Sequence, residues 1–136
     1  MSSILYTDHV PAVEFLDLSQ RVWPGAYGLG DVTLALSKTH NVGAWDERML
    51  VGSVRVLTDG YFFATIPEMF VDQNYRRRGI GRELMRRALG LAPRGKLFFG
   101  VQPGAVGFYE RIGCKPDLVA FVAEVSQLTS TGVSAQ

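Results

Sequence analysis

The stretch Arg76-Arg77-Arg78-Gly79-Ile80-Gly81-Arg82 decides the fold of this sequence. It lies between an apolar, strand-like run from Phe62 to Val71 and an amphipathic helical run from Ile80 to Leu91. Glycine lets the backbone approach a ligand closely, and the first N–H groups of a helix have no partner within it. The helix dipole and the arginine side chains also favour a bound anion. We therefore interpret the stretch as a cradle for a pyrophosphate group.

Other phosphate-binding motifs fit this stretch less well. A P-loop needs Lys-Ser or Lys-Thr after its glycines, and the one Lys-Thr pair, Lys38-Thr39, lacks the glycine before it. A dinucleotide fingerprint needs glycine or alanine where this sequence has Leu84. The spacing that fits is R/Q-x-x-G-x-G/A, with Arg76, Gly79 and Gly81 in the fixed positions. In this motif the chain resembles the GNAT acetyltransferase superfamily, which uses it to bind the pyrophosphate of acetyl-CoA.

The predicted order of elements also resembles the GNAT core. The order β-α-α-β-β-β-α-β-α-β covers residues 3–125. It implies an α/β (α+β) fold, with a central, mixed, mostly antiparallel sheet of about six strands and about four flanking helices. We expect one domain over residues 1–125 and a polar, mobile tail over residues 126–136. The expected helices cover residues 11–22, 31–37, 80–91 and 103–112, and the expected strands cover residues 4–6, 42–45, 50–57, 62–71, 96–101 and 118–125.

Individual residues sharpen this pattern. Asp31 is expected to cap the second helix. Ile80, Leu84, Met85, Ala88 and Leu91 share one helix face, which is therefore expected to be buried. Pro67 cannot donate to a ladder, so the strand that ends at Val71 is expected to be interrupted there. The resemblance implies that the pantetheine arm of the cofactor lies in the resulting splay.

A second motif supports the resemblance. Phe108-Tyr109-Glu110-Arg111-Ile112-Gly113-Cys114 resembles the F-Y-x-x-x-G-F that follows the fifth strand in that superfamily, with cysteine in place of the last phenylalanine. The stretches Arg55 to Gly60 and Val71 to Tyr75 also resemble a branch of small acetyltransferases. That branch includes the plant and cyanobacterial serotonin N-acetyltransferases.

Composition bounds the remaining possibilities. The chain has 136 residues, is 47% hydrophobic and carries a formal net charge of +1, which fits one folded domain without a general drive toward nucleic acid or membrane. A single cysteine, Cys114, excludes an internal disulfide framework and a CxxC metal site. We therefore expect no metal. No targeting segment or apolar run of about 18 residues is present, so we expect a cytoplasmic protein.

The resemblance implies two catalytic residues. Tyr109 is the candidate general acid for the leaving thiolate, because a phenol stays protonated at neutral pH. A core tyrosine is the structural alternative. Glu68 is the candidate base, acting directly or through water, since it is the only carboxylate within the apolar run. An exposed carboxylate on the solvent face of the strand, with ordered water as the base, is the alternative.

The cofactor contacts follow from the two motifs. Backbone groups of the strand before the cradle could pair with the pantetheine amides as an added strand would, and one of these N–H groups could polarise the thioester carbonyl. The predicted cofactor-binding residues are Met69, Phe70, Val71, Arg76, Arg77, Arg78, Gly79, Ile80, Gly81, Arg82, Gln102 and Phe108.

The resemblance implies an acetyl-CoA-dependent N-acetyltransferase in which a primary amine, as a small molecule, attacks the thioester directly. A non-catalytic CoA-binding module is the main alternative. Nucleic-acid binding through residues 76–87 ranks last, because Glu83 lies within the arginine cluster and no second basic arm exists. The segment from Val22 to Thr39 is rich in aromatic and aliphatic residues, which favours an apolar or arylalkyl amine. A homodimer paired through the last strand is compatible with the resemblance.

Overall fold

The computed structural model describes residues 3–126, and the chain divides into two compact units, residues 1–100 and 101–136. The first unit contains β1 (Leu5–Thr7), α1 (Ala12–Val22), α2 (Leu29–Ser37), β2 (His40–Asp46), β3 (Met49–Thr58), β4 (Ala64–Thr65), β5 (Met69–Val71), the 3₁₀ turn η1 (Gln73–Tyr75) and α3 (Ile80–Gly90). The second contains the 3₁₀ turn η2 (Pro103–Ala105) and α4 (Val106–Arg111). The expectation of a single domain stays a prediction.

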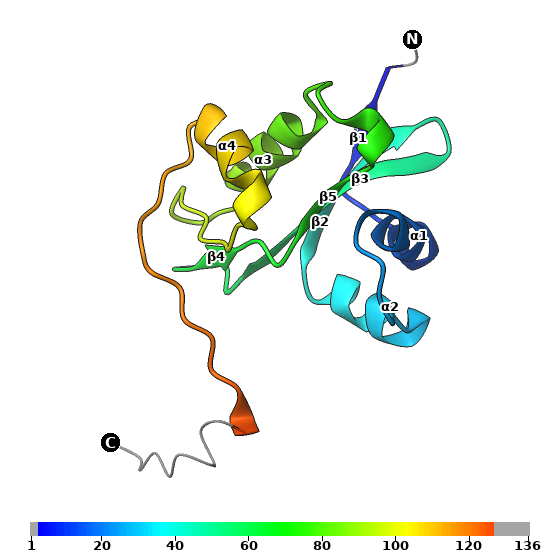
Figure 1. Cartoon of the computed structure of the whole chain (residues 1–136). Coiled ribbons are helices and arrows are strands. Elements are labelled where there is room, and N and C mark those ends of the chain that lie inside the picture. The colour runs from blue at the N-terminus through cyan, green and yellow to red at the C-terminus, as the bar shows by residue number, and fades with distance from the viewer. Residues whose placement is uncertain (1–2, 127–136) are drawn as a thin grey trace. The chain divides into compact units, whose positions relative to one another are not determined.

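An antiparallel sheet organises the first unit. Its order is β1-β2-β3-β4. The strand β5 also pairs with β3, at residues that precede the ones paired with β4. The helices α1 and α2 lie on one face of this sheet and α3 lies on the other (Figure 1). The predicted α/β architecture with a mostly antiparallel sheet is confirmed, although the described residues form five strands rather than six.

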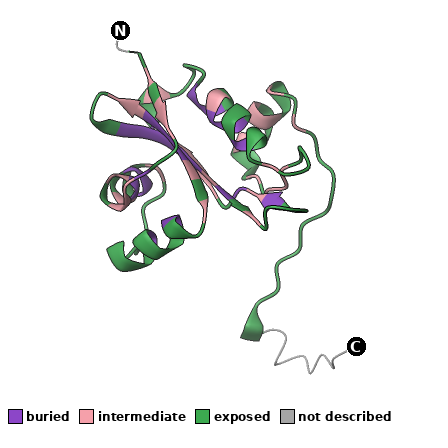
Figure 2. Cartoon of the chain, turned by 180° about the vertical axis from the view of Figure 1, so that it is seen from behind, coloured by how far each residue is buried: buried purple, intermediate pink, exposed green. Residues whose placement is uncertain are grey.

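The core lies on both faces of the central strands, as the buried residues in Figure 2 show. On one face, Phe15 and Leu18 of α1 pack with Val32 and Leu36 of α2. On the other face, α3 buries four of the five residues predicted for its apolar side: Ile80, Leu84, Met85 and Ala88. The fifth, Leu91, is 37% exposed because it follows the last helical residue, Gly90. Burial of these side chains anchors α3, and therefore its N-terminus, to the sheet.

The predicted break at Pro67 is confirmed. The expected single strand is divided into β4, which pairs with the C-terminal end of β3, and β5, which pairs with its middle. Leu57 and Thr58 pair with β4, whereas residues 52–54 pair with β5. The interruption falls where proline has no N–H to donate.

Three predicted elements differ from the structure: the second helix and the strands over residues 96–101 and 118–125. The second helix begins at Leu29 with Gly28 at its N-cap, so Asp31 lies in its first turn, where a carboxylate still interacts favourably with the helix dipole. The strand expected over residues 96–101 is reduced to one parallel bridge between Phe98 and Thr65.

The strand expected over residues 118–125 is absent. These residues are extended or begin a short helical turn, and Phe121 is 91% exposed. An apolar run forms a strand only when a ladder partner satisfies its backbone groups, and the described part of the second unit contains no strand. The tail predicted over residues 126–136 lies outside the described residues except for Ser126.

Gly52 allows α3 to approach the sheet closely. A Cβ on Gly52 would lie 2.9 Å from Cγ2 of Ile80 and 3.2 Å from Cδ1 of Leu84. We expect Gly52→Ala to lower the free energy of unfolding by about 1–3 kcal/mol, the usual cost of overpacking. Urea unfolding measures this loss.

The matched control for this prediction is Gly30→Ala in α2, where an added Cβ meets nothing within 4 Å. Alanine in a helix is more favourable than glycine, so this variant should be as stable as the original chain or more stable. Equal behaviour of the two variants would contradict the proposed contact between Gly52 and α3.

Candidate active site

The cradle is a turn whose backbone takes the left-handed conformation twice. Arg77 has φ of 64° and Gly79 has φ of 80°, and Gly79 is also the N-cap of α3. The first helical hydrogen bond runs from Glu83 N to Gly79 O at 3.1 Å. The N–H groups of residues 80–82 therefore have no acceptor within the helix and remain available to an anion.

Positive charge is concentrated at this helix end. Arg76, Arg77, Arg78 and Arg82 are all exposed. Arg78 stacks on the ring of Tyr75 at 4.8 Å, and Arg76 Nε donates to Val71 O at 3.4 Å. Cations at the positive end of a helix dipole repel it and one another. An anion bound between them would relieve this repulsion, so the arrangement favours a ligand such as pyrophosphate.

The strand before the cradle has an edge that no other strand within residues 3–100 covers, although Val71 O accepts Arg76 Nε. Arg55 N–H donates to Glu68 O at 3.3 Å, and Asp72 N–H donates to Val51 O at 2.7 Å. Backbone groups alternate in direction along an antiparallel strand. Because residues 68 and 72 face β3, Met69 and Val71 direct their N–H and C=O groups away from it. Within residues 3–100, no strand pairs with this edge.

The uncovered edge begins at the break. Before Pro67 the corresponding edge is occupied, since Phe98 N–H donates to Ala64 O at 3.1 Å and Ile66 N–H donates to Phe98 O at 3.3 Å. After Pro67 the two segments no longer pair. An extended ligand could therefore pair with β5 at the point where the neighbouring segment diverges.

Glu68 forms an ion pair that the sequence did not suggest. Arg55 Nη2 donates to its Oε1 at 2.7 Å and Arg55 Nε donates to its Oε2, so both carboxylate oxygens are used. The side chains of Arg55 and Glu68 are 15% and 25% exposed. This bidentate contact holds the Glu68 carboxylate in a fixed orientation against Arg55 of β3.

The second unit carries the F-Y-x-x-x-G-C motif. Gly113, with φ of 98°, ends α4 in a Schellman motif, in which Cys114 N–H donates to Tyr109 O at 2.9 Å and Gly113 N–H donates to Glu110 O at 3.1 Å. The rings of Phe108 and Tyr109 meet edge to face at 4.9 Å. Burial, followed by the nearby Cys114, raises the pKa of Tyr109 above its usual value. Its phenol is therefore protonated throughout the neutral range.

Gln102, predicted as a cofactor contact, precedes η2 in the same unit. Its backbone oxygen accepts the N–H of Ala105 at 2.8 Å, and its side chain makes no capping hydrogen bond to the turn. Its side chain is exposed, and the cofactor contact stays a prediction.

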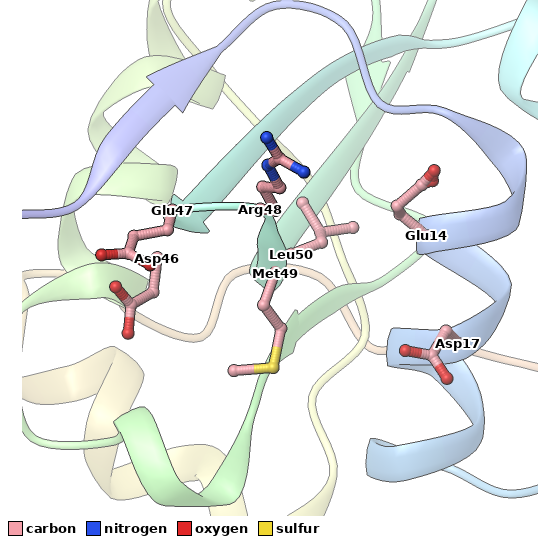
Figure 3. Close-up of a pocket in the computed structure, with 7 residues that line it drawn as sticks. All are labelled: Glu14, Asp17, Asp46, Glu47, Arg48, Met49 and Leu50. Carbon is pink, nitrogen blue, oxygen red and sulfur yellow. The ribbon is translucent and has the colours of Figure 1, made fainter.

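A separate pocket of about 570 Å³ lies between α1 and the β2–β3 hairpin (Figure 3). Glu14 and Asp17 of α1 line it together with Asp46 and Glu47 of the hairpin. Arg48 is the one basic residue in its lining. The excess of carboxylates makes this pocket unsuitable for a polyphosphate, which distinguishes it from the cradle.

Sequence reasoning missed the residues that support the site from a distance. Arg55 lies 13 residues before Glu68, and Arg21 of α1 lies 51 residues before its partner Asp72. One local signal was present, because Asp72 precedes a short polar turn and aspartate is a preferred capping residue. Charged pairs this far apart in the sequence have no periodicity that could reveal them.

No helix among residues 3–126 is both long and apolar enough to cross a membrane. The same residues contain no group of three or more His, Cys, Asp or Glu side chains placed to hold a metal ion.

Comparison with known proteins identifies related domains. A family model described as an acetyltransferase (GNAT) domain matches residues 31–128, which include parts of both units. A GNAT-family acetyltransferase from Streptococcus pneumoniae TIGR4 is 24% identical, with a TM-score of 0.71 over 100% of this chain and 96% of its own. No curated protein sequence matched the chain.

Two solved structures with known acceptors share the fold. Glucosamine-6-phosphate N-acetyltransferase from Arabidopsis thaliana is 12% identical, with a TM-score of 0.72 over 91% of this chain and 99% of its own. AAC(6′)-Iy, solved with the bisubstrate analogue CoA-S-monomethyl-acetylneamine, is 15% identical, with a TM-score of 0.70 over 90% and 97% of the two chains.

Proposed function

Because the chain belongs to the GNAT acetyltransferase family, we propose that it transfers the acetyl group of acetyl-CoA to the nitrogen of a primary amine. In this reaction the amine attacks the thioester carbonyl, a C–N bond forms and the C–S bond breaks. The products are an N-substituted acetamide and the free thiol of CoA. The observation that carries this proposal is the cradle at the N-terminus of α3. It follows β5, a strand with an uncovered edge, after the short turn η1.

The residues fit acetyl-CoA as a co-substrate. The N–H groups of residues 80–82 and the surrounding arginines would hold the pyrophosphate. The outward-facing backbone groups of Met69 and Val71 would pair with the amides of the pantetheine arm. An N–H of the same strand would polarise the thioester carbonyl, and such a preorganised donor typically contributes about 10²–10³ in rate.

We assign Tyr109 as the acid that protonates the leaving thiolate. A phenol whose pKa is raised by burial remains a proton donor at every pH where the thiolate needs one, since the thiol itself has a pKa of about 8.5. The position of Tyr109 in the F-Y-x-x-x-G motif supports this role.

We assign Glu68 as the proton acceptor for the ammonium form of the acceptor. The bidentate contact with Arg55 fixes the orientation of its carboxylate, which suits a proton acceptor. Because both oxygens already accept hydrogen bonds from Arg55, relay through an intervening water fits this geometry better than direct contact with the amine.

We propose an apolar or arylalkyl amine as the acceptor class. Trp23, Tyr27, Leu29 and Leu34 expose apolar surface between α1 and α2 and on α2 itself. Leu36, which was expected to contribute, belongs to the core and is 8% exposed. The sugar amines named for two fold neighbours are an alternative class.

One assay tests the proposed function. The purified chain is incubated with acetyl-CoA and with arylalkylamines, polyamines, amino sugars, amino acids or a lysine peptide, and release of CoA thiol is followed. Cys114→Ser removes the one protein thiol that could react with the detection reagent. We expect release that depends on an arylalkylamine. Tight acetyl-CoA binding without release for any amine would favour the non-catalytic CoA-binding module.

A further inference from the structure

Asp72 is a buried carboxylate at the start of the cradle. It follows β5 directly, is 7% exposed and uses both of its oxygens. Oδ1 accepts the N–H of Asn74 at 2.9 Å, which caps η1, and Oδ2 accepts Nε of Arg21 at 3.0 Å. The backbone oxygen of Asp72 also accepts the N–H of Tyr75 at 2.9 Å. One residue thus shapes the turn that leads into the cradle.

Arg21 connects this turn to α1 and to the sheet. Besides Asp72, its guanidinium contacts Leu50 O through Nη2 at 2.7 Å, and Asp17 through Nη1. Leu50 lies near the beginning of β3. The guanidinium therefore fixes α1, β3 and the turn after β5 relative to one another, because its donors are held in a rigid plane.

The other end of the turn is tethered to the β2–β3 hairpin. The hydroxyl of Tyr75 donates to Oδ2 of Asp46, and Arg78 covers the ring of Tyr75. The residues that follow, Arg76 to Gly79, are all exposed, and the contacts of Arg76 and Arg78 are with Val71 and Tyr75, on the segment just before them. Their conformation therefore depends on how the turn before them is anchored.

We propose that Asp72 and Arg21 are positioning residues for the cofactor, which hold the turn so that the cradle N–H groups are already oriented when acetyl-CoA arrives. This inference rests on the proposed function. The arginines of the cradle repel one another, so an unanchored turn would be free to leave the binding conformation in the absence of ligand. An anchored turn lowers the cost of ordering on binding and so raises affinity.

The test compares acetyl-CoA binding by calorimetry across three variants. Asp72→Asn keeps an oxygen that can cap Asn74 but removes the charge that pairs with Arg21. Arg21→Gln removes the guanidinium and serves if Asp72→Asn fails to fold. Asp17→Asn is the matched control, because it removes a carboxylate from the same arginine at an exposed site. We expect binding about tenfold weaker for the first two variants and unchanged for the control.

A purely stabilising role predicts a different outcome. In steady-state kinetics, positioning of the cofactor requires a raised KM for acetyl-CoA with kcat retained at saturating acetyl-CoA. Variants that lose resistance to urea but keep the original affinity and KM would overturn this inference alone. Failure of the original chain to bind acetyl-CoA would overturn both this inference and the proposed function.

Discussion

Replacing Gly79 with valine is expected to weaken acetyl-CoA binding by about a hundredfold. The φ of 80° at Gly79 is strained for any side chain and most for a β-branched one, at a cost of about 1–3 kcal/mol. A side chain would also project into the open space over the cradle, where a Cβ meets no protein atom within 4 Å. Each charge-assisted hydrogen bond that the phosphates no longer accept weakens binding by a further ~1.5–3 kcal/mol. Calorimetry with acetyl-CoA measures the change in affinity.

Gly60→Val provides the matched control. Gly60 has φ of 82°, and a Cβ there also meets nothing within 4 Å, so its backbone strain and free space match those of Gly79. It lies in the turn between β3 and β4, where Asp59 accepts the N–H groups of residues 61–63. Both variants should lose similar stability, but only Gly79→Val should lose affinity. Equal affinities would show that the cradle does not bind the cofactor.

The cradle and the helix after it could be predicted because their signals are local. Glycines at fixed spacing, an apolar face with helical period and an interrupting Pro67 all act within about a dozen residues. The structure bears out α3, the turn and the division into β4 and β5. The register that turns Met69 and Val71 outward follows from pairing with β3, which periodicity alone does not fix.

The supporting contacts could not be predicted because they join distant parts of the chain. Arg21 and Asp72 meet only after α1 has packed against β3, and Arg55 meets Glu68 only in the observed register. The strand expected over residues 118–125 illustrates the opposite error. Its apolar run is interrupted only by Glu124, but a strand also needs a ladder partner, which no local pattern reports. The finer likeness to the serotonin N-acetyltransferase branch stays a prediction, because the matching family model describes the GNAT domain in general.

Tyr109→Phe is expected to lower kcat by about 10²–10⁴, because a positioned general acid typically contributes that much. The ring that meets Phe108 at 4.9 Å is retained, so α4 should fold as before. Affinity for acetyl-CoA should stay within about twofold, since the phosphates and amides are held elsewhere. Tyr61→Phe, which removes a hydroxyl from an exposed ring, is the control and should leave both constants unchanged.

The pH dependence separates the acid from a structural tyrosine. Burial raises the pKa of Tyr109, so its proton is lost only as the pH rises through that raised value, above about 10. The rate of the original chain should therefore rise with pH as the amine loses its proton. At any pH under about 10, the rate should show no decline from deprotonation of Tyr109. If Tyr109→Phe lowers kcat, that loss should be the same at every pH below this limit, because the phenol stays fully protonated there. A loss that disappears toward pH 7 would instead assign the proton to a group that titrates near neutrality, and Tyr109 would be a packing residue.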